Sequence, residues 1–184
     1  MYLLGQYLGD GGIYRHRRDV YRLVIWGDSN YPRIAGEISD AMSAVLPHIR
    51  PRIQARRASA GVAINAYSRS WPCLFPQHGP GPKHKRPIAL ADWQQHLTYG
   101  HPEALIRGLI HSDGCRSANT ISSAGYHYSY PRYLFSNRSD DIRAIFCEHL
   151  DLLRIPWRPM NRWNISVARR EGVARLDEFV GPKR

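Results

Sequence analysis

Hydrophobic residues recur at helical spacing in two stretches of the chain, and each stretch follows a polar break. The breaks, 27–30 and 136–140, contain Asp, Asn and Ser, which are preferred N-cap residues. Apolar positions three and four residues apart share one side of a helix, so each predicted helix has a face that packs on a core. These positions are Ile34, Ile38, Ala41, Met42 and Val45 in the first stretch, and Ile142, Ile145, Phe146, Leu150 and Leu153 in the second.

Each predicted helix lies between two pairs of strand-like runs. β-branched and aromatic residues, which favour strands, are frequent in these runs. Every half therefore reads as a helix, a hairpin, a second helix and a second hairpin. The expected strands lie within 12–26, 52–57 and 62–68 in the first half, and within 115–135, 157–161 and 164–169 in the second.

The chain also repeats a nine-residue motif that ends in Asp-Gly. Residues 3–11 and 106–114 share Gly at the third place and a small residue at the seventh, and their aspartates, Asp10 and Asp113, are 113 − 10 = 103 residues apart. An internal repeat of this kind indicates two similar structural units. We therefore predict an α+β fold with two pseudo-symmetric αββαββ(α) half-domains.

Composition predicts the boundaries between the units. Segment 71–87 is rich in Pro, Gly and His, which predicts a loop, and 88–97 has a helix-like pattern. We expect an N-terminal half over 1–70, a linker with a basic loop and a short helix over 71–101, and a C-terminal half over 102–184.

The motif predicts a chemical site. Each copy reads as a helix, and the glycine after its last turn permits a left-handed cap. Small residues four apart, Gly5 and Gly9 in one copy and Gly108 and Ser112 in the other, allow two helices to approach closely. Such packing would bring the two aspartates together at negative helix ends, where one carboxylate raises the pKa of the other. A divalent cation with hard oxygen ligands, Mg2+ above all, relieves this repulsion.

Charge narrows the class of partner. The chain has 26 Lys and Arg against 15 Asp and Glu, a formal net charge of +11, which favours a polyanion such as nucleic acid. Only Lys83, Lys85 and Lys183 are lysines, and the remaining cations are arginines, which bind phosphate or a guanine edge with two hydrogen bonds. Three widely spaced cysteines argue against a disulfide framework or structural zinc. Without a signal-peptide pattern or a run of about 20 apolar residues, we expect a cytoplasmic, nucleoid-associated protein and no membrane partner.

Residues 3–11 and 106–114 resemble the paired signatures of the LAGLIDADG homing endonucleases, in their single-chain form with two fused halves. The resemblance covers nearly the whole chain, including the linker and a C-terminal helical segment at 173–180. It implies a monomer with a DNA-binding saddle of two four-stranded antiparallel sheets, which cleaves a double-stranded DNA target site and leaves short 3′ overhangs. The sequence departs from the family at the sixth motif place, where Leu8 and His111 replace a frequent Asp that is not the metal ligand.

The resemblance also implies the residues of the cleavage site. Mg2+ is the implied cation, with Mn2+ as a substitute and Ca2+ as a non-productive one. Family members often have a basic or polar side chain at the end of the last strand of each half, near the attacking water. The implied metal ligands are Asp10, Asp113, Gly9 and Ser112, and the basic residues at the matching strand ends are Arg69 and Arg169.

Residues of the predicted strands and of the basic loop are candidates for DNA contact. Alternate side chains of a strand face opposite sides, so only some of them can face DNA. We expect the aromatic run at 126–130 to pack rather than to stack on bases. The candidates are Arg15, His16, Arg17, Gln54, Arg56, Lys83, Lys85, Arg86, Arg116, Asn119 and Arg132.

Other functions remain open at this point. A non-cleaving DNA-binding transcription regulator or an RNA maturase can have the same fold, although the usual mark of that change is loss of the motif acids, and both are present. A His-metal nuclease of the HNH kind would need a His-paired ββα unit, and the nine histidines lack that spacing. A purely structural module leaves the repeated Asp-Gly helix ends unexplained.

Overall fold

The structure is a computed structural model that describes residues 1–56, 60–123 and 126–183, without the side chains of 121–128. The first half contains α1 (Tyr2–Asp10), β1 (Gly11–Arg15), the 3-10 turn η1 (Arg17–Asp19), β2 (Tyr21–Asp28), α2 (Pro32–Val45), β3 (Arg52–Ala55) and β4 (Gly61–Ser68). The linker contains α3 (Trp71–Leu74), the 3-10 turn η2 (Lys83–Lys85) and α4 (Asp92–Gly100). The second half contains α5 (Pro102–Asp113), β5 (Gly114–Ser123), β6 (Tyr126–Ser136), α6 (Asp140–Leu152), β7 (Arg158–Pro159), β8 (Asn164–Val167) and α7 (Arg170–Phe179).

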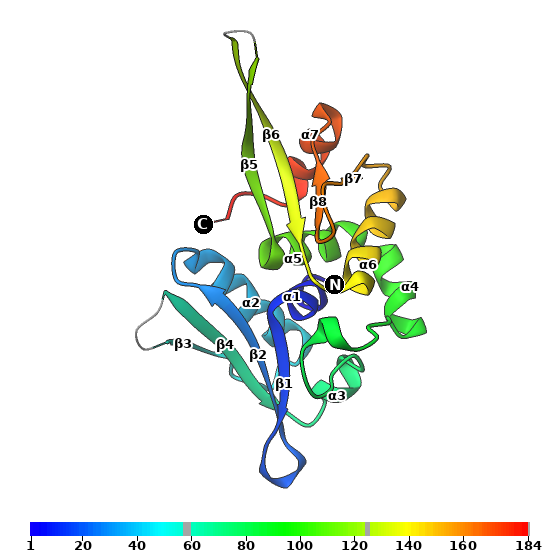
Figure 1. The fold of residues 1–184 in the computed structure, drawn as a ribbon. Coiled ribbons are helices and arrows are strands. Elements are labelled where there is room, and N and C mark those ends of the chain that lie inside the picture. Colours follow the sequence, from blue (N-terminus) through cyan, green and yellow to red (C-terminus); the bar gives the residue numbers. More distant parts are fainter. Residues whose placement is uncertain (57–59, 124–125, 184) are drawn as a thin grey trace.

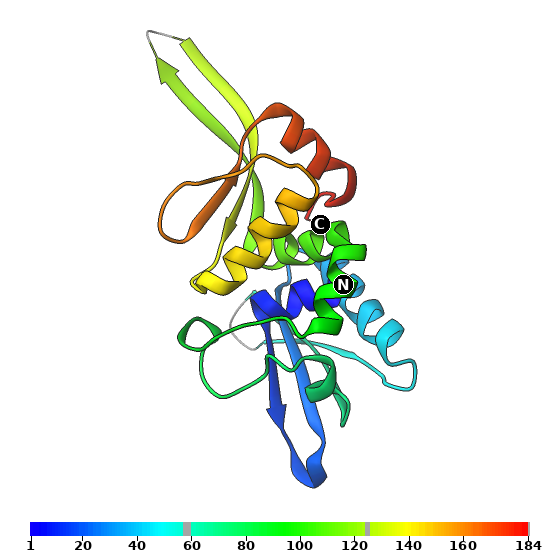
Figure 2. The same cartoon turned by 90° about the vertical axis from the view of Figure 1, so that its right-hand side faces the viewer.

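Each half has a four-stranded antiparallel sheet (Figure 1). The strand orders, β1-β2-β4-β3 and β5-β6-β8-β7, place matching strands in matching positions. The registers also match, because Gly11 pairs with Ile25 and Gly114 pairs with Phe135, directly after the two motif helices. From these helices, the β1–β2 and β5–β6 hairpins extend in opposite directions (Figure 2). The predicted α+β fold with two pseudo-symmetric halves is confirmed.

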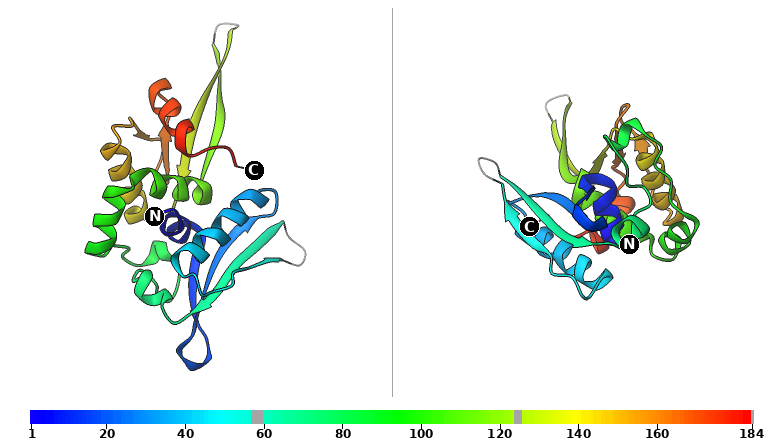
Figure 3. Two further views of the ribbon diagram at one scale, coloured as in Figure 1. Left: turned by 180° about the vertical axis from the view of Figure 1, so that it is seen from behind. Right: turned by 90° about the horizontal axis from the view of Figure 1, so that it is seen from below.

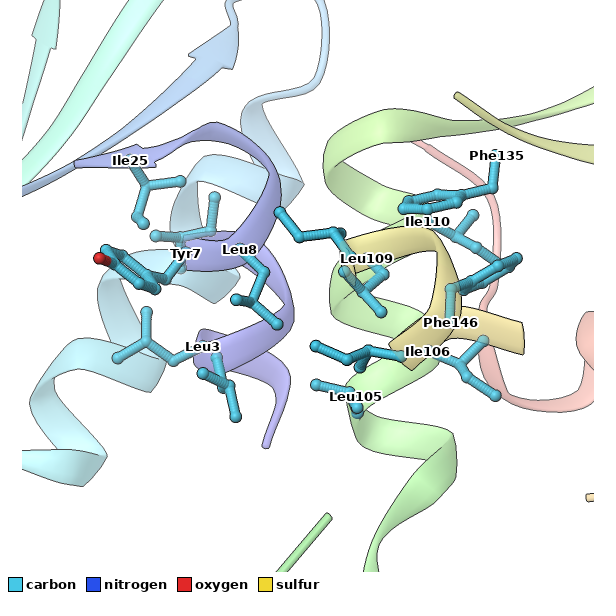
Figure 4. Packing of buried hydrophobic residues seen from close by; sticks show 14 of the residues in the cluster. Leu3, Tyr7, Leu8, Ile25, Leu105, Ile106, Leu109, Ile110, Phe135 and Phe146 are labelled. Carbon is cyan, nitrogen blue, oxygen red and sulfur yellow. The ribbon is translucent and has the colours of Figure 1, made fainter. Parts of the chain in front are cut away.

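The two motif helices, α1 and α5, pack side by side at the centre of the molecule. Their buried side chains join those of both sheets in one hydrophobic core (Figure 4). A Cβ on Gly5 would lie 2.5 Å from the carbonyl oxygen of Leu105, and one on Gly108 would lie 2.2 Å from that of Tyr2. The helices therefore approach as closely as the small residues of the motif predict.

The predicted left-handed cap at the glycines that follow these helices is wrong, and these glycines have another role. Gly11 has φ −90° and ψ 154°, and Gly114 has φ −111° and ψ 169°, so both are extended and start a strand. A Cβ on Gly11 would lie 2.5 Å from Tyr7 Cα, and one on Gly114 would lie 2.8 Å from Ile110 Cα. Glycine is needed here because the strand leaves the helix directly against its last turn.

Each sheet has an inner face that packs on helices and an outer face that does not. In the first sheet, Leu23, Ile25 and Ile64 are fully buried on the inner face, and α2 lies against it next to α1 (Figure 3). By strand alternation and register, the outer face of the first sheet carries Gly12, Tyr14, Arg22, Val24, Trp26, Ala63, Asn65, Tyr67, Arg52 and Gln54. The outer face of the second sheet carries Cys115, Ser117, Asn119, Tyr130, Arg132, Leu134, Ser166 and Arg158.

The linker packs against both halves. Trp71 is fully buried, and its Nε1 donates a hydrogen bond to the carbonyl of Ala66 at 3.0 Å. Ile88 is buried, and its backbone N–H donates to Asp141 Oδ2 of α6 at 2.7 Å. The predicted helix start at residue 88 is wrong: α4 begins at Asp92, where Gln94 Oε1 accepts a hydrogen bond from the N–H of the N-cap residue Ala91 at 3.0 Å.

Local details also differ from the sequence-based expectations. Arg17 lies in η1 and Arg56 follows β3, so neither is in a strand as predicted. The N-cap prediction is right for α6, where Ser139 Oγ accepts from the N–H of Ile142, and wrong for α2, whose N-cap is Tyr31 without a side-chain bond. No helix among the described residues combines the length and the apolar character needed to cross a bilayer.

Candidate active site and nucleic-acid interface

The two motif aspartates are the last residues of α1 and α5, and the packing of these helices brings them together. Ser112 Oγ of α5 donates a hydrogen bond to Asp10 Oδ2 of α1 at 2.7 Å. Gly9 of α1 lies against the other acid, because a Cβ here would be 2.8 Å from Asp113 Oδ2. Each acid therefore lies beside the motif helix of the other half.

The acids line two separate cavities, which we call half-site A and half-site B. Each half-site combines an aspartate of one motif, the residue that precedes the aspartate of the other motif, and one lysine. The pseudo-two-fold relation of the halves explains this crossed arrangement. Half-site A contains Asp113, Gly9 and Lys83, and half-site B contains Asp10, Ser112 and Lys183.

The surroundings of Asp113 destabilise its negatively charged form. Burial, with a further contribution from the charge of Asp10, raises the pKa of Asp113 to about 6. Asn137 Nδ2 donates to Asp113 Oδ2 at 2.6 Å, which opposes the rise. The predicted direction of the shift is therefore right, but burial is a larger cause than the second carboxylate.

Two lysines lie at the helix ends. Lys83 Nζ donates to the carbonyls of Tyr7, Gly9 and Gly11 at 2.5, 3.0 and 2.6 Å. Lys183 Nζ donates to the carbonyl of Ser112 at 3.3 Å. Burial lowers the pKa of Lys83 to about 8, while the two aspartates oppose this effect. Sequence reasoning predicted Lys83 only as a DNA contact and missed Lys183, although the rarity of lysine in the chain was a usable signal.

This donor set fits a divalent cation. Among the described residues, no group of three or more His, Cys, Asp or Glu side chains is placed to hold a metal, so a cation here would need backbone oxygens as well. The half-sites offer them, because carbonyls at a helix C-terminus carry partial negative charge. An ammonium group already lies on the carbonyls of Gly9 and Ser112, which shows that both positions attract a cation.

The structure does not bring Arg69 and Arg169 to the acids, contrary to the prediction. Gly11, which follows Asp10, is level with Ile64 of β4 in the sheet register. Arg69 follows Ile64 by five residues, which is about 17 Å along the strand at ~3.3 Å per residue. Arg169 is the N-cap of α7 and lines a cavity that contains neither acid.

Part of the predicted DNA-contacting set lies on the outer face of the first sheet or borders it. Gln54 is exposed on this face. Arg56 lies over the ring of Trp26 at 4.9 Å, and the ring of His16 contacts that of Tyr67 at 5.5 Å. Arg15 instead has the phase of the inner face at the tip of the hairpin.

Basic side chains of the hairpin tip and the linker complete the first half of the predicted set. Arg15 pairs with Asp19 at 2.5 Å, and Arg17 is exposed beside it in η1. Lys85 is exposed in η2, and Arg86 lines half-site A.

Sequence reasoning missed a polar cluster at the centre of this face. Arg22 Nε donates to Asn65 Oδ1 at 3.2 Å, and Asn65 Nδ2 donates to Gln54 Oε1 at 3.1 Å. Arg22 also lies over the ring of Tyr67 at 5.9 Å. Period-two alternation around the buried Leu23 could have identified Arg22 as an outward-facing residue. The face leads to the acids, because Tyr14 borders half-site A and Trp26 borders half-site B.

On the second sheet, two of the residues predicted to contact DNA, Asn119 and Arg132, lie on the outer face. Three buried polar atoms of this face have no hydrogen-bond partner in the described part of the chain: Ser117 Oγ, Arg132 Nε and Ser166 Oγ. Buried polar atoms normally have partners, so unpaired ones on one face are a mark of a surface that binds something polar.

Arg116, the third predicted DNA contact in this sheet, does not lie on the outer face. It has the phase of the inner face and forms two hydrogen bonds with Asp177 of α7, at 2.8 and 2.9 Å. Tyr133 Oη donates to the same carboxylate at 2.7 Å. Arg116 therefore attaches α7 to the sheet.

No family model matches the chain, and no curated protein matches its sequence. Solved structures match over almost its whole length. A structure of I-DmoI in complex with DNA and Mn has 17% sequence identity and a TM-score of 0.62, and the match covers 98% of this chain and 94% of that one. The LAGLIDADG meganuclease I-AabMI, bound to uncleaved DNA, has 12% identity and a TM-score of 0.60, with 97% and 81% covered. The LAGLIDADG homing endonuclease I-SmaMI, bound to cleaved DNA, has 8% identity and a TM-score of 0.57, with 98% and 83% covered.

Proposed function

Because the chain has the fold of the LAGLIDADG homing endonucleases, we propose that it is a site-specific homing endonuclease for double-stranded DNA. As a monomer with two half-sites, it hydrolyses one phosphodiester bond in each strand and leaves short 3′ overhangs. The observation that carries this proposal is the crossed pair of half-sites, with Asp113 beside Gly9 and Asp10 beside Ser112. Two such sites related by a pseudo-two-fold axis match two antiparallel DNA strands.

In each half-site, the aspartate and the crossed backbone carbonyl would hold a divalent cation, for which we propose Mg2+ or Mn2+. When bound, this cation supplies Lewis-acid stabilisation of the phosphate charge and favours deprotonation of a water. The protein's own groups prepare the carboxylates. Asn137 orients Asp113 and the Ser112 hydroxyl orients Asp10, each through a short hydrogen bond. With a pKa of about 6, Asp113 is ionised at pH 7.5 and ready for a cation.

The outer faces of both sheets are the proposed DNA-binding surface. Support comes from the Arg22–Asn65–Gln54 cluster on one sheet and the unpaired polar atoms around Arg132 on the other. Amide and guanidinium groups match the hydrogen-bonding edges of bases in the major groove. Asn119 joins them by its position on the outer face, and Lys85, Arg86 and the hairpin-tip arginines are assigned to phosphate.

The test is a cleavage screen of a DNA library with Mg2+ or Mn2+, followed by sequencing of the ends. The wild-type chain is expected to produce double-strand breaks with short 3′ overhangs, and Asp10→Asn and Asp113→Asn to abolish them while binding is retained. Asp92→Asn is the matched control, because this exposed aspartate lies in α4 and lines neither half-site. Sequence-specific binding without cleavage by the wild type would identify a regulator instead, and cutting by both active-site variants would refute the half-site assignment.

Salt dependence gives an independent test of the partner. Arginines and lysines that neutralise phosphates release counterions, so the affinity should fall steeply between about 50 and 200 mM salt. Ca2+ should support binding without cleavage. An affinity that does not change with salt would contradict DNA as the partner.

A further inference from the structure

Two of the three lysines of the chain lie in the half-sites, and neither belongs to the repeated elements. Lys83 comes from η2 in the linker, and Lys183 comes from the segment that follows α7. The third, Lys85, is exposed two residues from Lys83. The half-sites are therefore completed by two different segments, and each segment supplies one ammonium group.

The ammonium group of Lys83 is bound in the way that a metal cation would be. All three of its hydrogen bonds end on carbonyls at the C-terminal end of α1, and one of these is the carbonyl of Gly9, which half-site A offers to a metal. The ammonium group also lies over the ring of Tyr7, 4.8 Å from its centre. An ammonium has three N–H donors and no acceptor, so this geometry uses its full donor capacity.

Lys183 has the equivalent place in half-site B. Its Nζ lies on the carbonyl of Ser112 and 6.0 Å from the centre of the Tyr31 ring. Burial lowers the pKa of Lys183, and the nearby Cys115, Asp10, Asp113 and Asp28 oppose this effect. Each lysine is therefore hydrogen-bonded to the carbonyl that precedes one of the two motif acids.

The C-terminal segment is held in this place by α5. His111 Nε2 lies 2.9 Å from the carbonyl oxygen of Val180, and Arg107 Nε donates to the same oxygen at 3.3 Å. A carbonyl oxygen only accepts hydrogen bonds, so Nε2 carries a proton and donates to Val180, while Nδ1 lies 3.1 Å from Tyr2 Oη. His111 is therefore the anchor of the segment.

We propose that Lys83 and Lys183 are internal counter-ions of the acid pair, one in each half-site, and that a divalent metal displaces them from the carbonyls of Gly9 and Ser112. The proposal rests on the proposed function for the identity of the metal site. An ammonium group and a divalent cation repel each other and compete for the same carbonyl oxygens, so binding of one excludes the other from that oxygen. The released ammonium groups are then free to pair with the phosphates of bound DNA, and metal and DNA favour each other's binding.

The first test follows the lysines directly. With 15N-labelled lysine, the chain has only three side-chain Nζ signals, and Ca2+ is a diamagnetic, non-productive probe. Saturating Ca2+ should shift the signals of Lys83 and Lys183 strongly and leave that of Lys85 unchanged. Assignment comes from the single variants Lys83→Met, Lys183→Met and Lys85→Met. If Lys83 and Lys183 keep their signals when the acid pair is saturated with Ca2+, the proposal is overturned.

The second test measures Mn2+ affinity by calorimetry without DNA. Removing one positive charge from a half-site should strengthen Mn2+ binding there by about tenfold. Lys183→Met and Lys83→Met should show this gain, and Lys85→Met should bind as the wild type does. Lys183 lies in a terminal segment, so its variant answers the question even if Lys83→Met does not fold. Unchanged or weaker Mn2+ binding in Lys183→Met refutes the displacement.

The double variant Asp10→Asn/Asp113→Asn separates this inference from the proposed function. If it binds Mn2+ as well as the wild type, the acids are not the metal site and both ideas fail. If its Mn2+ binding is lost but the lysine variants bind no more tightly than the wild type, only the counter-ion proposal fails.

Discussion

The contact between α1 and α5 can be tested by adding a single methyl group. In Gly108→Ala, the new Cβ would lie 2.2 Å from the carbonyl oxygen of Tyr2 and 3.0 Å from the Cα of Gly5. Both obstacles are backbone atoms and cannot rotate away. Since real Cβ atoms essentially never come within 3.0 Å of another heavy atom, the helices must separate by at least 0.8 Å.

The expected loss of stability follows from two opposing effects. Overpacking of a core costs typically ~1–3 kcal/mol, and the rigid obstacles here place Gly108→Ala at the upper end. Alanine has a better helix propensity than glycine by about 1 kcal/mol. The net loss is therefore about 2 kcal/mol, which lowers Tm by roughly 4–8 °C for a chain of this size.

Thermal unfolding followed by circular dichroism measures this effect, and Gly36→Ala is the matched control. Gly36 also lies inside a helix, α2, but a Cβ there would have no neighbour within 4 Å, so this variant should be more stable than the wild type by ~0.5–1 kcal/mol. DNA cleavage by Gly108→Ala should fall by about 100-fold, because the acids move apart. A Gly108→Ala protein that gains stability as Gly36→Ala does would show that the helices are not in this close contact.

Further predictions concern pH, the second sheet and the C-terminal segment. The folded-state pKa of Asp113 is raised to about 6, so the metal-free protein loses stability as the pH rises from about 4 through 6. Asp113→Asn should therefore increase the unfolding free energy in EDTA by about 3 kcal/mol at pH 7.5 and have little effect at pH 4. An equal effect at both pH values would contradict burial of the charge as the cause. Arg132→Ala should weaken DNA binding measured by fluorescence anisotropy. Arg116→Ala should change this binding less than twofold and should instead lower the stability, because it detaches α7 from the sheet. The reverse pattern would refute the assignment of the two faces. His111→Ala should make the C-terminal segment more accessible to carboxypeptidase, and protection equal to that of the wild type would show that His111 does not anchor it.

The sequence was sufficient to predict the fold because each level of the pattern pointed to the same arrangement. The repeated motif fixed the place of both acids, and small residues at four-residue spacing predicted the close helix contact that Gly5 and Gly108 make. Helical and strand periodicity located most elements, because the spacing of apolar residues determines which face of a helix or strand is buried. The linker helix starts later than predicted, at Asp92, because the Gln94 side chain caps it at Ala91, a contact that apolar spacing does not show.

The candidate site was predicted only in part, since much of it depends on contacts between distant segments. Nothing in the local sequence around Lys183 shows that the C-terminal segment runs back to Ser112. Arg116 was misassigned because a strand pattern cannot show that Asp177 of α7 lies next to it. Arg69 was misassigned because a matching place at a strand end says nothing about its distance from the acid in the sheet register.

The cluster on the outer face of the first sheet has a consequence for changing the preferred target. Arg22, Asn65 and Gln54 hold one another through hydrogen bonds, and Asn65 also donates to the carbonyl of Arg52 at 3.2 Å. Substituting any one of them releases the donors or acceptors of the other two, so in the proposed role as base readers their preferences for base pairs could not be altered independently. Redesign for a new recognition sequence should therefore vary these three positions as a single combinatorial unit.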